Sequence, residues 1–219
     1  MTKLYLALVH YPVYNKYGKV IMTSIANLDI HDIARTAACY GIESYTIISP
    51  DPLQREMVGR ILDFWDTNDA LLYNPDRREA LARVTCQESI EALISQITSQ
   101  EGLQPIVITT TAREIPGQIS FGDLDSLCAG SRPALLLFGT GYGLAEEIHR
   151  SADYILMPIK GTGSYNHLSV RSAVAIVLDR ITSENINGRN HGYSANNRQR
   201  PNQNRLSRLS RRRYGQGPL

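Results

Sequence analysis

The stretch Ala134-Leu135-Leu136-Leu137-Phe138-Gly139-Thr140-Gly141-Tyr142-Gly143-Leu144 joins a short apolar run to a glycine-rich turn. The pattern recurs where the run Tyr154-Ile155-Leu156-Met157 leads into a second turn, Ile159-Lys160-Gly161-Thr162-Gly163. Apolar runs of this length between chain-breaking residues are typical of buried parallel strands. Residues 165–173 then open a predicted helix that runs to about residue 181. Two such units side by side predict a parallel α/β sheet with a ligand crevice at the carboxyl ends of its strands.

The rest of the chain extends this alternation of strands and helices towards the N-terminus. Strands are expected at residues 3–9, 45–48, 80–84 and 106–108. Helices are expected at residues 29–40, 52–65 and 120–129, and another behind a capping box of Thr85 and Glu88, ending near residue 99. Residues 10–21 are expected to form a loop, and residues 68–78 a connector. This order predicts one α/β domain with a parallel sheet flanked by helices.

The composition excludes several classes of protein. The chain has 219 residues, of which 42% are hydrophobic, and this is enough for one sizeable core. No apolar run approaches the roughly 18 residues of a membrane span, and the N-terminal run is too short and strand-like for a signal peptide. Cys39, Cys86 and Cys128 lie far apart, which argues against a disulfide framework or a zinc site. We therefore expect a cytoplasmic protein with no membrane segment and no metal.

The charge of the chain is divided unevenly along its length. Residues 187–219 contain eight arginines and no acidic residue, whereas residues 1–186 contain 15 basic and 21 acidic residues. Residues 184–219 are also rich in Asn, Gln, Ser and Gly, so we expect a basic tail that is disordered because it cannot offset its ordering entropy. Such a tail fits a nucleic-acid arm that contacts phosphates, or alternatively a segment that only keeps an acidic domain soluble.

The first glycine-rich turn is compatible with more than one role. Glycines let backbone N–H groups approach a ligand closely, but they also serve tight turns that bind nothing. The turn lacks the Lys-Ser/Thr pair of a phosphate-binding loop, and its spacing is not G-x-G-x-x-G. His10 and His167 are candidate acid–base groups, and a structural or substrate-positioning role is the simpler interpretation for both.

Three motifs resemble the SPOUT superfamily of S-adenosylmethionine-dependent RNA methyltransferases. They are the F-G-T-G-Y-G-L turn at residues 138–144, the proline–isoleucine turn at 158–159 and the helix start Y-N-H-L-S-V-R-S-A at 165–173. With residues 7–13 and 23–35 they are similar to a bacterial subgroup of that superfamily, over about residues 4–182. The resemblance implies a domain at residues 1–183 with a parallel sheet, a C-terminal trefoil knot and a homodimeric assembly. It also implies S-adenosylmethionine as the methyl donor and RNA, either tRNA or rRNA, as the substrate.

The resemblance implies a donor pocket built from three loops. Its cofactor-binding residues would be Thr109, Thr110, Thr111, Phe138, Gly139, Thr140, Gly141, Pro158, Ile159, Gly161, Tyr165, Asn166, Leu168 and Ser169. An uncharged adenosine and a methionine moiety need backbone donors and apolar walls rather than a cationic phosphate cradle, and these loops meet that requirement. No metal ligand is implied.

The resemblance also implies a catalytic residue, Arg35. It aligns with an arginine on the first helix of ribose 2′-O-methylating members, where it would contact phosphate or help to deprotonate the nucleophile. The surrounding pattern departs from those members, since Asp29 replaces an asparagine and His31 a glycine. The target atom is therefore open between a ribose oxygen and a base nitrogen. Guanine N1 methylation elsewhere in the superfamily relies on a C-terminal helical domain, whose apolar pattern the tail lacks.

Two alternatives compete with this interpretation. One is a non-catalytic RNA-binding protein that retains a donor pocket, and the other is a nucleotide-binding α/β enzyme with an open sheet. The second predicts affinity for a phosphorylated cofactor, and the missing cationic phosphate cradle counts against it. Binding tests with S-adenosylhomocysteine and NAD separate these two classes of ligand.

Overall fold

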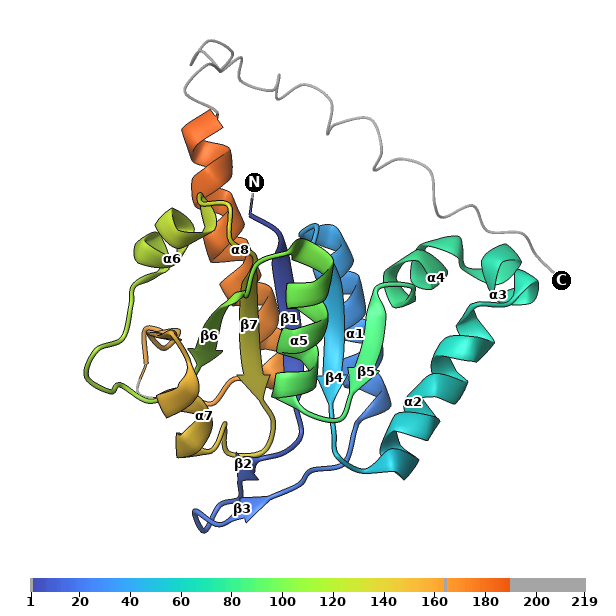
Figure 1. The fold of residues 1–219 in the computed structure, drawn as a ribbon, viewed down its shortest axis with the longest axis horizontal. Helices are drawn as coiled ribbons and strands as arrows, with labels where there is room; N and C mark the ends of the chain where they lie inside the picture. Colours follow the sequence, from blue (N-terminus) through green and yellow to red (C-terminus); the bar gives the residue numbers. More distant parts are fainter. Residues whose placement is uncertain (1, 164, 190–219) are drawn as a thin grey trace, which may run out of the picture.

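The strand nearest the N-terminus lies inside the sheet and not at its edge. The main sheet contains β1 (Leu4–Val9), β4 (Ser44–Ile48), β5 (Val84–Gln87), β6 (Ile106–Thr110), β7 (Ala134–Gly139) and β8 (Tyr154–Leu156). In the computed structural model, which describes residues 2–163 and 165–189, their order is β5-β4-β1-β7-β6-β8. Figure 1 labels the first five of these strands. All five neighbouring pairs are parallel. The predicted α/β class with a parallel sheet flanked by helices is confirmed.

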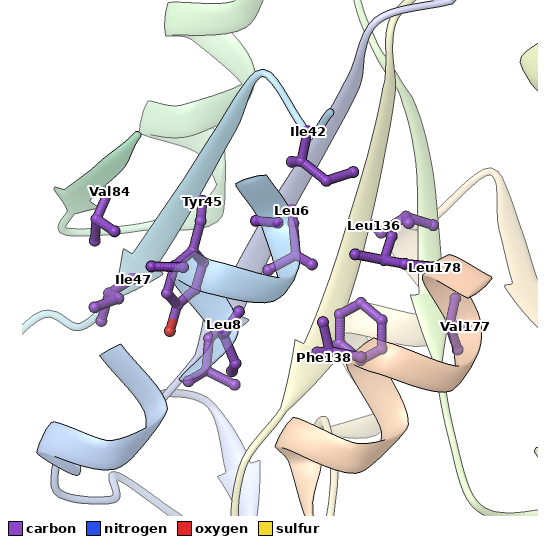
Figure 2. Close-up of a cluster of buried hydrophobic side chains, with 14 of the residues drawn as sticks. Leu6, Leu8, Ile42, Tyr45, Ile47, Val84, Leu136, Phe138, Val177 and Leu178 are labelled. Carbon is purple, nitrogen blue, oxygen red and sulfur yellow. The ribbon is translucent and has the colours of Figure 1, made fainter. Parts of the chain in front are cut away.

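Helices cover both faces of the sheet, because successive side chains of a strand point to opposite sides. The helices are α1 (Asn27–Cys39), α2 (Pro52–Trp65), α3 (Asn68–Tyr73), α4 (Pro75–Leu81), α5 (Ile90–Glu101), α6 (Phe121–Cys128), α7 (Glu146–Ser151) and α8 (Val170–Arg189). Leu6 and Leu8 of β1 belong to a buried cluster that includes residues of α1, α4, α6 and α8, part of which is shown in Figure 2. Tyr5 and Val9 belong to a second cluster with residues of α5.

The parallel register brings the carboxyl ends of the central strands together. Val9 at the end of β1 pairs with Gly139 at the end of β7, and Thr109 of β6 pairs with Leu137. The chain therefore leaves β1, β6, β7 and β8 at the same edge of the sheet. Ligand sites of parallel α/β sheets lie at this edge.

The predicted loop at residues 10–21 is wrong in part, because it contains a small hairpin. Strands β2 (Val13–Tyr14) and β3 (Val20–Ile21) pair in antiparallel fashion. The turn between them is held by Asn15, whose side chain accepts hydrogen bonds from two backbone N–H groups further along the turn. Each strand has only two residues, too few for an alternating pattern to be visible in the sequence.

Three predictions between α2 and α5 differ from the structure. The strand expected at residues 80–84 begins only at Val84, because the preceding residues end α4, which Asn74 caps through its side chain. The capping box of Thr85 and Glu88 does not form, since Thr85 lies in β5 and Ser89 caps α5 instead. The connector expected at residues 68–78 consists of α3 and α4.

The last helix begins later than predicted and continues further. It begins at Val170 and not at residue 165, and it runs to Arg189, past the predicted domain boundary at residue 183. Most of the predicted tail, residues 190–219, lies outside the described residues. Within the described ranges, no helix combines the length and hydropathy that a membrane span requires. The same ranges contain no group of three metal-ligating side chains.

Candidate functional site

A cavity of about 990 Å³ lies at the carboxyl ends of β6, β7 and β8. Its walls come from residues 110–113 at the end of β6, residues 138–143 at the end of β7, and Leu156, Met157 and Ile159 at the end of β8, together with residues between 165 and 177 around the start of α8. Asp29 of α1 completes the wall. The three loops expected from the sequence therefore converge on a single cavity.

The first glycine-rich turn packs closely against the N-terminal hairpin. A Cβ atom at Gly141 would lie 2.8 Å from the backbone oxygen of Tyr14, and the φ of Gly141 is +59°. A Cβ atom at Gly139 would lie 2.6 Å from the backbone nitrogen of Leu144. The N–H of Tyr142 donates to the same Tyr14 oxygen at 2.8 Å. Both positions therefore require glycine for backbone packing, in addition to any access that they give a ligand.

A chain of hydrogen bonds holds Thr140 in this turn. Its Oγ1 atom lies 2.5 Å from the Oγ1 atom of Thr23 and donates to the carbonyl of Val9 at 3.1 Å. The Nδ1 atom of His10 lies 3.0 Å from the same Thr23 hydroxyl. Burial lowers the pKa of His10 to about 4, so its ring is neutral at pH 7. His10 is fully buried and not part of the cavity lining, in agreement with a structural role.

A hydrogen bond connects the segment before α8 to the loop after β6. The amide of Asn166 donates to the carbonyl of Ala112 at 3.0 Å. The hydroxyl of Ser169 accepts the N–H of Ser172 at 3.2 Å and so caps the first turn of α8. Direct hydrogen bonds thus connect the cavity's walls.

Eleven of the fourteen residues predicted for cofactor binding line this cavity. They are Thr110, Thr111, Phe138, Gly139, Thr140, Gly141, Ile159, Tyr165, Asn166, Leu168 and Ser169. The other three lie outside its lining and stay predictions as donor contacts. Thr109 is buried, and its hydroxyl lies 2.9 Å from the Nδ1 atom of His149. Pro158 is also buried, whereas Gly161 is exposed.

The predicted catalytic residue lies apart from these groups. Arg35 is exposed on α1 and is not among the residues that line the cavity. Asp29, which is nearly two turns earlier on the same helix, does line it. The structure thus places the carboxylate, and not the guanidinium, beside the predicted donor loops.

Sequence reasoning missed an ion pair in the cavity wall. The Oδ1 atom of Asp29 lies 3.6 Å from the Nε atom of Arg171, whose Nη1 atom lies 3.9 Å from the Oδ2 atom of Asp32. The side chain of Asp29 is only 16% exposed, and its burial raises its pKa, although the charge of Arg171 opposes that shift. The one available signal was the position of Arg171 inside the Y-N-H-L-S-V-R-S-A motif.

The comparison with protein families decides the identity of the chain. Residues 3–183 match the model of a family described as SAM-dependent RNA methyltransferase. The chain belongs to this family. The match confirms both the predicted methyltransferase function and S-adenosylmethionine as the donor.

Curated relatives of this methyltransferase differ in length. An uncharacterized protein of Aquifex aeolicus is 39% identical over 183 residues, which are 83% of this methyltransferase and 89% of that protein. The tRNA (guanine-N(1)-)-methyltransferase of Oleidesulfovibrio alaskensis is 41% identical over 181 residues, which are 83% of this methyltransferase but 42% of that enzyme. The methyltransferase thus spans less than half of this longer relative, so the guanine-N1 activity belongs to a chain with further sequence.

Solved structures support the fold. The TrmH/SpoU tRNA modifying enzyme of Aquifex aeolicus has a TM-score of 0.55 and 14% identity, covering 86% of this methyltransferase and 78% of that chain. The SpoU methyltransferase AviRb of Streptomyces viridochromogenes, in complex with AdoMet, has a TM-score of 0.52 and 16% identity, covering 84% and 58% of the two chains. The methyltransferase therefore shares the fold of SpoU-type methyltransferases, as its motifs predicted.

The residues of the cavity fit S-adenosylmethionine chemically. Phe138, Leu156 and Ile159 supply apolar walls for an adenine ring and a thioether chain. The guanidinium of Arg171, which lines the cavity, can pair with the carboxylate of the methionine moiety. The cavity volume also falls within the roughly 300–1,000 Å³ of pockets that hold small ligands.

Proposed function

We propose that this cavity holds S-adenosylmethionine and directs its methyl group to a nucleotide of tRNA or rRNA. The observation that carries the proposal is the convergence of three predicted donor loops on one cavity. When bound, the donor supplies a methyl group activated by a positive sulfur. The contribution of the protein is then mainly to hold donor and RNA at the correct distance and orientation.

We assign the role of proton acceptor to Asp29. Transfer would break the S–CH3 bond of the donor and the O–H or N–H bond of the RNA nucleophile, and it would form the bond between the methyl carbon and that nucleophile. The proton would pass to the Asp29 carboxylate, and neutral S-adenosylhomocysteine would be the leaving group. This carboxylate lines the cavity, is largely buried and is held by Arg171. Because burial raises its pKa, it is a stronger base than an ordinary aspartate.

Arg35 is assigned to the RNA backbone. Of the two roles expected for it, its exposure favours the phosphate contact, because deprotonation requires hydrogen-bond reach of the nucleophile. A guanidinium also stays charged at every physiological pH and binds phosphate with two parallel hydrogen bonds. Arg35 then orients the RNA, and Asp29 accepts the proton from the reacting atom of the RNA.

The choice of tRNA or rRNA rests on the relatives and on charge. Two relatives that are at least 40% identical to this chain over the matched residues are named as tRNA methyltransferases. The eight arginines of residues 187–219 add positive charge that favours a polyanionic substrate. We also propose that the methyltransferase works in the cytoplasm.

We further propose a homodimer and a C-terminal trefoil knot. The knot is supported by the order of the last elements, since β8 pairs beyond β6 while α8 returns to pack on α1 and β7. True knots are rare in proteins, so an experimental chain trace is the direct test. Sedimentation at several protein concentrations tests the dimer.

Calorimetric titration with S-adenosylmethionine tests the donor site. Position 141 is unsuitable for a blocking variant, because any side chain there collides with Tyr14. Ala112→Trp places bulk in the cavity, and Ala129→Trp, at an exposed site on the end of α6, is the matched control. Micromolar binding that only Ala112→Trp abolishes is the expected result. A folded wild type that binds neither S-adenosylmethionine nor S-adenosylhomocysteine contradicts the assignment.

A further inference from the structure

We infer that the groove between α1 and α2 seats a nucleotide of the RNA that flanks the methylated one. This inference rests on the proposed function, since it presumes an RNA substrate. The groove encloses about 630 Å³ and is lined by residues of α1 and α2 and by Arg77 of α4. It is separate from the donor cavity and shares no lining residue with it.

The groove contains an aromatic platform centred on Trp65. The ring of His31 lies 5.8 Å from Trp65 in an edge-on arrangement, and the ring of Phe64 lies 5.6 Å away at 90°. The guanidinium of Arg77 lies 5.1 Å from the centre of the indole ring. Phe64 is 65% exposed, although a phenyl ring gains from burial. Rings and guanidinium planes in this arrangement are the surfaces on which unpaired nucleobases stack.

Positive charge in the groove favours RNA over a second copy of the protein as its occupant. The guanidinium groups of Arg60 and Arg77 both line the groove, and the side chain of Arg60 is 78% exposed although Glu56 pairs with it. A guanidinium binds phosphate through parallel hydrogen bonds and stacks on flat rings. In a two-fold dimer formed through this groove, the same guanidinium groups of the two copies would face each other.

The groove adjoins the donor cavity across one turn of α1. Asp29 lines the cavity, Asp32 lines the groove, and Arg171 contacts both carboxylates. Side chains three residues apart on a helix lie about 5–6 Å from each other. A single strand whose target nucleotide enters the cavity therefore passes the groove with an adjacent nucleotide.

The sequence provides a direct probe, because Trp65 is the only tryptophan of the chain. The full-length protein is titrated with a labelled oligocytidine RNA in the presence of saturating S-adenosylhomocysteine, which keeps the donor cavity occupied. We expect tryptophan emission to fall in parallel with the anisotropy change of the RNA. Phe64→Ala and Arg77→Gln should each weaken binding about tenfold, the typical effect of losing one stacking partner. Tyr73→Ala removes an aromatic ring that is 82% exposed outside the groove, and it should bind as the wild type does.

Three results would overturn the inference. The RNA could bind with unchanged tryptophan emission and with equal affinity for wild type, Phe64→Ala and Arg77→Gln, or it could fail to bind the wild type. Alternatively, tryptophan emission could change with protein concentration alone in a way that Phe64→Ala abolishes, which would make the groove an interface between copies. Transfer of a tritiated methyl group from S-adenosylmethionine to total RNA is measured on the same protein preparations without S-adenosylhomocysteine. Transfer by a wild type that fails the groove tests leaves the proposed function standing.

Discussion

The carboxylate of Asp29 lies 3.6 Å from the guanidinium of Arg171, and this pair joins the first turns of α1 and α8 in the wall of the donor cavity. One helix follows the hairpin near the N-terminus, and the other is the last helix of the domain. Their meeting places an ion pair in the cavity wall, in addition to Arg113 from the loop after β6. The first prediction concerns this pair.

Asp29→Asn should lower methyl transfer by about a hundredfold or more, because it removes the proposed proton acceptor but keeps the shape of the side chain. Since burial raises the pKa of Asp29, the wild-type rate should fall as the pH is lowered through that raised pKa, where the carboxylate becomes protonated. The rate of the Asp29→Asn variant should not show this decrease at low pH. Donor affinity is measured alongside, and Asp32→Asn, which also loses a contact to Arg171, is the control. Equal losses in both variants would point to the ion pair alone.

Gly141→Ala should destabilise the fold by about 3 kcal/mol, because the new methyl group meets the Tyr14 carbonyl and the backbone is left-handed. Gly18→Ala is a matched control, since Gly18 has a φ of +73° but open space around its Cβ position. Gly18→Ala should lower the free energy of unfolding by about 1 kcal/mol, and this value measures the cost of a left-handed backbone alone. Urea unfolding measures both values. Equal losses would refute the proposed collision with Tyr14.

His10 should make the protein less stable in mild acid. Burial lowers its pKa to about 4 in the folded state, whereas an unfolded histidine titrates near pH 6.5. Protonation of His10 therefore favours unfolding. The contribution of neutral His10 to the free energy of unfolding is complete above pH 6.5 and is lost as the pH falls towards 4. Between pH 7 and pH 5 the loss should be about 2 kcal/mol. His10→Gln should remove this part of the pH dependence, while His167→Gln, at an exposed position, should keep it.

Deletion of residues 190–219 should weaken RNA binding and flatten its dependence on salt. The deleted segment contains seven of the eight arginines found after residue 186, and each phosphate contact adds to the salt slope. A chain with these seven arginines replaced by lysine should retain most of the slope, because charge is preserved. Affinity and slope that do not change on deletion would reduce the segment to a solubilising role.

The loops that line the cavity could be predicted because their signals are local. Glycine spacing and apolar runs bounded by breakers identified β7, β8 and the turns after them, and the parallel register then fixed where these turns meet. Eleven predicted cofactor residues accordingly line one cavity. The position of Arg35 outside the cavity lining could not be predicted in this way, because the sequence of a helix does not give the direction of a side chain relative to a distant loop.

Contacts between distant segments could not be predicted. Asp29 and Arg171 carry no mutual signal in the sequence, and neither do Trp65 and Arg77, which meet only once α2 and α4 pack together. The hairpin β2–β3 was invisible for another reason, since pairs of two-residue strands leave no periodicity. In each case the information lies in tertiary packing and not in local pattern.

The support that Tyr14 gives to Gly141 has a consequence for how the enzyme is made. The turn at residues 139–143 needs the hairpin that the ribosome synthesises early, and the cavity wall also needs Arg171 from the last helix. A nascent chain that lacks α8 has an unfinished donor site. Translation must therefore pass the start of α8 before this cavity can form, and a chain that terminates earlier lacks one of its walls.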